Sequence, residues 1–308
     1  MKANWDYYRA KWFFGAIKRR LLHSYFSSYA DRPFLSDEKG NEIIYHAILA
    51  GKPFAASRFG STELSIMTNR EGRENGRHVR CDDNRICALS GFFPNDKDAI
   101  DQFCVEMKKV IPDIDLLASW YLPMEEYFVA RYMPGAQISG LSCVEPYAFE
   151  RPWSAALKSK KVLVIHPFAG SITKQYERRE KIYPGTDILP QFDLKIIKAV
   201  QTIAGEKDER FKDWFDALSY MKKEMQKIDF DVAIIGCGAY GMPLAAEAKR
   251  MGKVAVHMGG ATQLLFGIMG NRWQNNGTIT SFCNEHWIRP DVTEVPQQSE
   301  IVEGSCYW

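Results

Sequence analysis

Three side chains that can take part in chemistry stand at the ends of apolar runs of the sequence. Arg58 closes the run 53–58, Glu63 follows it closely, and His166 closes the run 161–166. A carboxylate can act as a base or bind a divalent cation, an arginine suits phosphate, and a histidine can exchange a proton. We take Glu63, Arg58 and His166 as the candidate catalytic residues.

Each of these residues also has an ordinary structural role open to it. Glu63 can pair with the dipole at a helix N-terminus, and Arg58 can form a salt bridge with Asp82 or Asp83. His166 can equally be a hydrogen-bonded histidine of the core. The sequence leaves these alternatives open.

Two glycine-rich turns indicate an anionic ligand. Gly236, Gly238 and Gly241 fit the pattern Gly-x-Gly-x-x-Gly between a predicted strand and a predicted helix, whose N-terminus favours phosphate. Gly259 and Gly260 form a second turn after the next predicted strand. Because both turns open toward one edge of a sheet, together they favour a diphosphate-bearing ligand.

The first turn lacks one mark of an NAD site. Such a site has an Asp or Glu about 20 residues after the glycines, which binds the ribose. The matching place at 256–258 holds Val-His-Met. The unit therefore predicts a phosphate or ribose ligand and no NAD. A turn that serves only strand–helix packing is the alternative.

Two further pairs of residues are candidates for substrate binding. Ser171 and Gln175 lie one turn apart on a predicted helix. Glu145 and Tyr147 flank a proline and combine an acid with a ring that can stack on a base or sugar. Capping and packing are the alternative roles.

The elements that must position these residues alternate between strands and helices from residue 53 to residue 258. This alternation predicts an α/β fold, Rossmann-like, with a mostly parallel sheet and helices on both faces. We expect one catalytic domain at 41–308 and an N-terminal helical segment at 1–40. The expected strands are 53–58, 114–119 and 161–166, the expected helices are 41–51, 97–110 and 208–227, and a strand–turn–helix–strand unit is expected over 229–257.

The composition is that of an ordinary globular protein. The 308 residues are 46% hydrophobic and 25% charged, with a formal net charge of +2. This balance argues against a nucleic-acid partner, and no apolar run is long enough to span a membrane. The seven scattered cysteines include no Cys-x-x-Cys pair, which indicates reduced thiols in a cytoplasmic protein.

Basic and aromatic residues gather near the start of the chain. Residues 7–30 hold five lysines or arginines, no acid and many aromatic rings. On a helix, this mixture suits the surface of an anionic membrane. We favour the interpretation that the aromatic rings pack on the domain. Peripheral contact with the inner face of a membrane is the alternative.

Motifs spread along the chain resemble those of bacterial GT-D-type glycosyltransferases, which act in surface-polysaccharide and glycoprotein glycosylation pathways. The similarity runs from about residue 40 to Trp308. The motifs are Ser57-Arg-Phe-Gly-Ser-Thr-Glu63, Gly91-Phe-Phe-Pro94, Val164-Ile-His-Pro-Phe168 with Ser171, Ile172 and Gln175, and Ile235-Gly-Cys-Gly-Ala-Tyr-Gly241 with Gly259-Gly-Ala-Thr-Gln263.

The resemblance implies a Rossmann-like fold, a nucleotide-sugar donor, a saccharide or lipid-linked acceptor and, often, Mn²⁺ or Mg²⁺ held by an Asp-x-Glu motif. It also adds Ser61, Tyr240 and Gln263 to the candidates for nucleotide binding. Ser61 stands where the motif has its Asp, and Glu63 matches the second acid. Because a serine hydroxyl is a weaker metal ligand than a carboxylate, Glu63 is left as the one metal candidate and metal dependence stays open.

The predicted function is therefore transfer of a sugar from a nucleotide-diphosphate donor in surface-polysaccharide synthesis. Two other classes stay open. One is an NAD- or SAM-dependent enzyme built on the same layer, and the missing ribose acid counts against it. The other is a non-catalytic nucleotide-sugar-binding partner of polysaccharide assembly that has lost the metal acid at Ser61.

Overall fold

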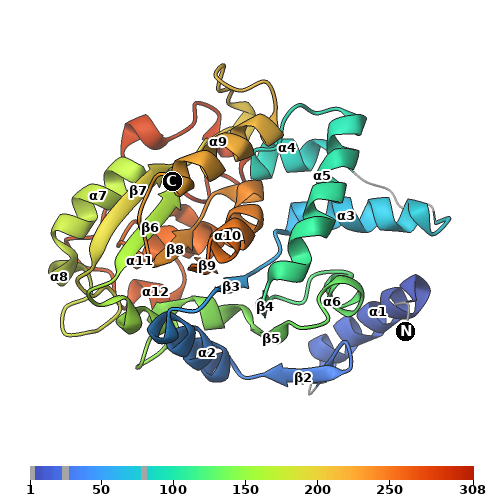
Figure 1. Ribbon diagram of the computed structural model, residues 1–308, viewed down its shortest axis with the longest axis horizontal. Helices are drawn as coiled ribbons and strands as arrows, with labels where there is room; N and C mark the ends of the chain where they lie inside the picture. The colour runs from blue at the N-terminus through green and yellow to red at the C-terminus, as the bar shows by residue number, and fades with distance from the viewer. Residues whose placement is uncertain (1–3, 23–27, 78–81) are drawn as a thin grey trace.

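A single twisted sheet runs through the protein. The computed structural model describes residues 4–22, 28–77 and 82–308, without the side chains of 16–22. Within these residues the sheet has nine strands in the order β1-β2-β5-β4-β3-β9-β8-β6-β7, and the neighbouring strands are parallel except for β1 and β2 (Figure 1). The strands are β1 (Ser28–Tyr29), β2 (Arg32–Leu35), β3 (Phe54–Ser57), β4 (Leu116–Ser119), β5 (Gln137–Gly140), β6 (Lys161–His166), β7 (Asp193–Lys198), β8 (Val232–Ile235) and β9 (Val254–His257).

Helices cover both faces of this sheet, so the predicted fold class is confirmed. The side chains of α1, α3, α4, α5, α6, α9 and α10 pack on one face, and those of α2, α7, α8, α11 and α12 pack on the other. The helices are α1 (Trp5–Leu22), α2 (Asp37–Ala50), α3 (Ser61–Glu74), α4 (Asn84–Ser90), α5 (Lys97–Val110), α6 (Glu125–Tyr132), α7 (Ala169–Glu177), α8 (Arg179–Ile182), α9 (Trp214–Gln226), α10 (Gly241–Arg250), α11 (Thr262–Leu265) and α12 (Gly277–Thr280).

The strand sequences explain why both faces are covered. Successive side chains of a strand point to opposite faces, so Leu163 and Ile165 of β6 enter one core while Val162 and Val164 enter the other. All four are fully buried. Burial on both faces of a continuous apolar strand is typical of parallel sheets.

Two predicted helices start at other residues because polar side chains cap them. The helix expected at 41–51 begins at Asp37, since the Ser36 hydroxyl accepts the N–H of Lys39 at 3.2 Å, and Gly51 ends it as expected. The helix expected at 208–227 begins only at Trp214, after the cap Asp213. Side-chain caps thus decide where both helices start.

Residues 1–40 are helical only in part. In α1, Trp5 and Tyr8 pack their rings on Tyr127, with centroids 5.2 and 6.1 Å apart. β2 then pairs with β5 and extends the main sheet, and α2 already begins at Asp37. The segment therefore supplies one edge of the sheet as well as a helix.

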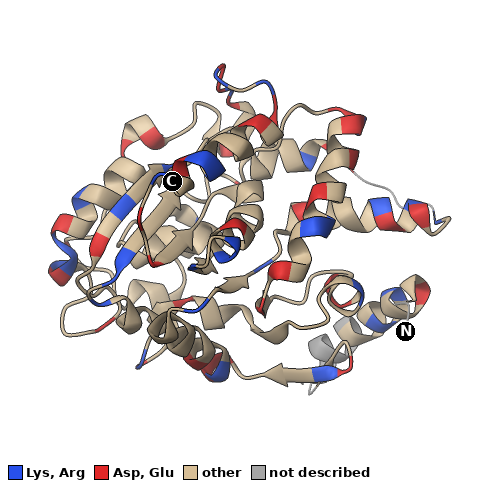
Figure 2. Cartoon of the chain, viewed as in Figure 1, with Lys and Arg blue, Asp and Glu red and all other residues tan. Residues whose placement is uncertain are grey.

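Charges of both signs are interspersed over the outer helices (Figure 2). This agrees with the small net charge of the sequence. The described cysteines are free thiols, and Cys81 lies outside the described residues. Among the described helices none is both long and apolar enough to cross a membrane.

Candidate functional site

Two adjoining cavities open at the carboxyl ends of β3, β9, β8 and β6. In open α/β sheets this edge is where ligands bind. The wider cavity has a volume of about 420 Å³ and the narrower one about 80 Å³. Because Arg58, Ser90, Gly238, Gly260 and Tyr307 line both, the cavities are two parts of one site.

Arg58 leaves the end of β3 with its guanidinium between the two cavities. Its Cζ lies 5.2 Å from the centre of the Trp120 ring. Gly259 has φ +64° and lies so close that any side chain there would overlap the guanidinium. Within the described chain no ion pair with Asp82 or Asp83 forms, and the guanidinium donates only to a backbone carbonyl at 3.3 Å. Its positive charge is therefore available to a ligand.

Glu63 lies in the first turn of α3, as predicted, and is only 6% exposed. Its carboxylate accepts the Thr62 hydroxyl at 2.8 Å and folds back over Gly60, which leaves no room for a side chain there. The Thr62 hydroxyl also contacts that of Ser90. Gly60, and not a Ser or Thr, is the residue before the first helical turn. The carboxylate faces the wider cavity.

His257 is a site residue that the motif reasoning missed, although it ends β9 as His166 ends β6. Its Nδ1 is 2.9 Å from the Ser57 hydroxyl, and its other ring nitrogen faces Gly241, where a side chain would overlap the ring. Burial and the charge of Arg58 lower the pKa of His257 to about 3. The ring is therefore neutral near pH 7 and fixes β3 and β9 against α10.

His166 lines the narrower cavity. Its Nδ1 accepts the backbone N–H of Phe168 at 3.0 Å, so the ring proton of the neutral form is on Nε2. Burial lowers the pKa of His166 to about 3. The residue can therefore donate a hydrogen bond near pH 7 but cannot supply a proton as an imidazolium. The proton-exchange role open to it from sequence is not supported.

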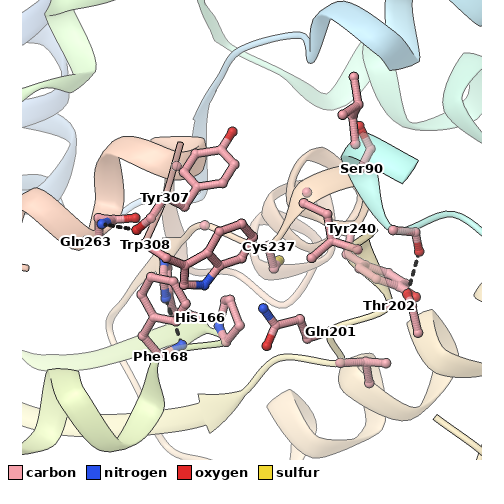
Figure 3. A pocket seen from close by; sticks show the side chains of 18 of the residues that line it. Ser90, His166, Phe168, Gln201, Thr202, Cys237, Tyr240, Gln263, Tyr307 and Trp308 are labelled. Carbon is pink, nitrogen blue, oxygen red and sulfur yellow. Dashed lines mark hydrogen bonds between the residues drawn. The ribbon is translucent and has the colours of Figure 1, made fainter. Parts of the chain in front are cut away.

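The narrower cavity suits a single flat ring. Figure 3 shows His166, Gln201 and Trp308 close together around its centre, with Phe168 and Tyr240 nearby. Its volume corresponds to roughly five to eight water molecules. The indole N–H of Trp308 is buried and has no partner among the described residues. A ring that offers acceptors at its edge would satisfy it.

The first glycine turn is shaped at least partly by packing. A side chain on Gly236 would meet the carbonyl of Gly259 and the hydroxyl of Thr262. One on Gly241 would overlap His257. The packing role left open in the sequence is thus present. Gly238 and Gly260 also line both cavities.

The far wall of the wider cavity comes from the C-terminal part of the chain, which the sequence motifs did not indicate. Arg272 lies over the ring of Tyr307, with Cζ 4.8 Å from its centre, and forms an ion pair with Glu303. Trp273 lines the same wall. Opposite stands Glu145, whose pKa burial raises to about 7 against the nearby charge of Arg58. Aromatic rings, arginines and carboxylates thus surround one cavity.

Three predicted binding residues do not reach the cavities. The Ser171 hydroxyl donates to Glu294 at 2.5 Å, and the Gln175 amide donates to three backbone carbonyls. Tyr147 is 4% exposed within the apolar core. Periodicity placed these residues near the right strands but could not show that they point away from the cavities. We do not retain them as ligand-binding residues.

Gly241 and Gly259 are not among the residues that line the two cavities, whereas Ser61, Tyr240 and Gln263 are. Ser61 faces the wider cavity, and its side chain is exposed. Tyr240 lines the narrower one and stacks on Trp214, with centroids 5.3 Å apart. Gln263 lines the narrower cavity too, while its amide donates to the carbonyls of Ile268 and Tyr307.

The residues of the Asp-x-Glu position do not form a site for a divalent cation. Glu63 is the one carboxylate there, and Ser61 and Thr62 add only neutral hydroxyls. In the described part of the chain no three His, Cys, Asp or Glu side chains gather as metal ligands. Mg²⁺ and similar hard cations favour sites with carboxylate oxygens. The donor set therefore fits the cation that the resemblance implies less well than an Asp-x-Glu motif would.

A known protein family matches part of this chain. Residues 147–265 match the family described as a GT-D fold-like domain. The match spans less than half of the chain and includes β6, His166 and both glycine turns, whereas Arg58 and Glu63 precede it. The match supports the predicted GT-D-type glycosyltransferase as a fold and as an enzyme class.

Two solved structures are also similar to this chain. One is described as showing that the highly conserved domain of unknown function 1792 has a distinct glycosyltransferase fold; it is 10% identical, the alignment covers 86% of this chain and 93% of that one, and the TM-score is 0.45. A selenomethionine-substituted structure of domain of unknown function 1792 has the same identity and coverage and a TM-score of 0.44. No curated protein matches the chain.

Proposed function

We propose that the protein transfers a sugar from a nucleotide-diphosphate donor to a saccharide or lipid-linked acceptor in surface-polysaccharide synthesis. The observation that carries the proposal is the pair of joined cavities at the carboxyl edge of the sheet. One is sized for a ring, and the other is wide and polar, with Arg58 where they meet. A donor has the same order of parts: base, diphosphate and sugar.

The base of the donor occupies the narrower cavity in this proposal. Its walls offer the N–H groups of His166 and Trp308 and the ring of Tyr240. Aromatic walls with a few fixed polar groups are typical of small-molecule sites. Because the volume suits one ring, a pyrimidine nucleotide is expected to bind more tightly than a purine nucleotide.

The sugar and the acceptor occupy the wider cavity, where Glu63 is the base. Its carboxylate is held by Thr62 and takes the proton of the attacking hydroxyl of the acceptor. The bond between the sugar and the donor phosphate breaks, and its electron pair stays on the phosphate oxygen. Positive charge beside that oxygen stabilises the transition state.

A ligand panel tests the donor class. Thermal melting is measured with UDP, CDP, GDP, NAD and S-adenosylmethionine, each with EDTA or Mn²⁺. A ligand at 100 times its dissociation constant stabilises by ~2.7 kcal/mol. Stabilisation by a pyrimidine nucleoside diphosphate is expected. Stabilisation by NAD or S-adenosylmethionine alone would refute the proposal.

The role of Glu63 is tested by Glu63→Gln. The amide keeps the shape and can still accept the Thr62 hydroxyl, but it cannot take a proton. We expect sugar transfer to fall at least about 100-fold while the melting temperature and nucleotide binding are kept. Glu38→Gln, at an exposed position of α2, is the control. Normal transfer by Glu63→Gln would show that this carboxylate is not the base.

The departure at Ser61 favours a second candidate function, that of a non-catalytic nucleotide-sugar-binding partner of polysaccharide assembly. The two functions share the donor site and differ in turnover. Binding of a nucleoside diphosphate, with neither transfer nor hydrolysis of any nucleotide-sugar in either metal condition, would select the non-catalytic function.

We further propose that α1 brings the enzyme to the inner face of a membrane. Phe13 and Phe14 are 57% and 68% exposed, whereas Trp5 and Tyr8 on the same helix are buried. Packing by the buried rings therefore leaves the two exposed rings available for contact with a membrane. The side chains of Lys18, Arg19 and Arg20 and the residues Tyr25 and Phe26 lie outside the described part.

Sedimentation with vesicles of anionic phospholipid tests this contact. The double variant Phe13→Ser, Phe14→Ser is expected to lose most of the bound fraction, because the apolar surface it removes would enter the lipid. Val292→Ser is the matched control, since Val292 is 82% exposed and far along the chain. Deletion of 1–30 is less informative because it removes Tyr29, which is buried. Equal binding by the double variant and the control would refute the contact.

A further inference from the structure

Two arginines, Arg58 and Arg272, line the wider cavity together with Tyr307. Arg272 lies over its ring and approaches the phenol oxygen, with Nη1 at 3.3 Å. Burial raises the pKa of the Tyr307 phenol, and the charges of both Arg272 and Arg58 act to lower it. Both guanidinium groups are therefore close enough to act on one ligand beside this phenol.

Stacking holds both guanidinium groups in place. Arg58 lies over Trp120 and against Gly259, and Arg272 lies over Tyr307 with Trp273 nearby. A stacked guanidinium keeps the N–H groups at its edge free. These planar N–H groups match two oxygens of a phosphate. The aromatic rings thus hold both guanidinium groups in place before a ligand arrives, although Arg272 already donates to Glu303 and Tyr307.

The two arginines differ in their partners. Arg272 forms an ion pair with Glu303, which offsets its charge, so it would offer a bound anion oriented N–H groups more than net positive charge. Arg58 has no ion pair within the described residues, and its charge acts on Glu145, whose pKa burial nevertheless raises to about 7. A bound anion would therefore meet a net positive charge mainly at Arg58, beside the junction of the two cavities.

We propose that Arg58 and Arg272 bind the diphosphate of the donor directly, in place of a divalent cation. The inference rests on the proposed function, and it follows from the poor fit between the Ser61-Thr62-Glu63 donor set and a hard cation. When the bond between the sugar and the phosphate breaks, the electron pair stays on the diphosphate, and the two arginines neutralise it. The new bond forms to the acceptor oxygen, and Glu63 takes the proton.

Calorimetric titration of the full chain with inorganic pyrophosphate in EDTA tests this clamp without any turnover. We expect binding in EDTA, and a dissociation constant that rises at least about tenfold in Arg58→Lys and in Arg272→Lys, since lysine keeps the charge but loses the paired N–H geometry. Arg179→Lys is the matched control, because Arg179 also lies over a tyrosine, Tyr176, and pairs with a glutamate. Its binding should equal that of the wild type.

A second variant keeps the test decisive if an arginine variant fails to fold. Ser61→Asp restores the second acid at an exposed position, so folding should be kept. We expect it to bind pyrophosphate more weakly in EDTA, because a negative charge is added to the cavity, and to regain affinity with Mn²⁺. No pyrophosphate binding by the wild type in EDTA, or unchanged binding by Arg58→Lys, would overturn the clamp.

The failure of this inference is distinct from the failure of the proposed function. Sugar transfer that requires Mn²⁺, with no pyrophosphate binding in EDTA, overturns the clamp and leaves the glycosyltransferase function in place. Pyrophosphate binding that depends on both arginines, with no binding of any nucleoside diphosphate, overturns the function and leaves an anion clamp.

Discussion

The buried carboxyl of Glu125 makes a sharp prediction about stability and pH. Glu125 begins α6 just beyond the end of β4 and is fully buried. It accepts the hydroxyl of Tyr29 at 3.0 Å and that of Ser119, so it ties the N-terminal strands to the sheet. Burial raises the pKa of this carboxyl to about 7, although its hydrogen bonds act in the other direction.

The sign of the effect follows from proton binding. Between pH 4.5 and about 7 the native carboxyl holds its proton, whereas the unfolded one, with its ordinary pKa of 4.5, has lost it. The native state binds more protons in this window, so the free energy of unfolding falls as pH rises. From the two pKa values, the loss is about 3 kcal/mol. It is absent below pH 4.5 and complete above about pH 7.

Urea unfolding of the wild type and of Glu125→Gln at pH 4.5, 6 and 8 measures this effect. The amide is neutral at each pH, so the variant should gain about 3 kcal/mol on the wild type between pH 4.5 and pH 8. The comparison cancels the titration of all other groups. Glu38→Gln, at an exposed position, should show no such change. A constant difference between Glu125→Gln and the wild type would refute the reasoning.

Two further predictions concern residues around the cavities. Burial lowers the pKa of His166 to about 3, so the unfolded state binds a proton before the native state does as pH falls below 6.5. The free energy of unfolding of the wild type should therefore fall by up to about 5 kcal/mol by pH 3, and His166→Gln should remove this loss. Comparing the slopes of unfolding free energy against pH checks this, and parallel slopes would contradict it. Gly241→Ala should destabilise by ~1–3 kcal/mol, because its methyl group would overlap the His257 ring that Ser57 holds in place. Gly277→Ala, where a methyl group meets nothing, is the control in the same urea assay, and equal stability of the two variants would argue against a fixed ring.

The central layer of the fold could be predicted from local sequence because its signals are local. Four consecutive apolar residues in 161–166 favour a strand covered on both faces, and this segment is β6 to the residue. Gly51 ends α2 in the left-handed conformation that favours glycine. Parallel strands then carry Arg58 and His166 to one edge of the sheet without any further information.

The direction of each side chain depended on tertiary packing. Ser171 and Gln175 follow β6 closely enough to reach the ligand edge, but they form hydrogen bonds with Glu294 and with the carbonyls around Gly267 instead. Tyr147 enters the core for the same reason, since residues distant in sequence complete its surroundings. Periodicity gives the face of an element and does not give its neighbours.

Local sequence was enough to predict the parallel sheet, the resemblance to glycosyltransferases and the position of Glu63 in the first turn of a helix, because each depends on residues a few places apart. Tertiary packing was needed to form the two cavities, to bury His166 and His257 so that they are neutral, and to bring Arg272 and Tyr307 close to Arg58. Arg58 and Arg272 are separated by more than half of the chain. Their proximity results from the order of the strands in the sheet and from the packing of the C-terminal segment, neither of which can be predicted from a local pattern.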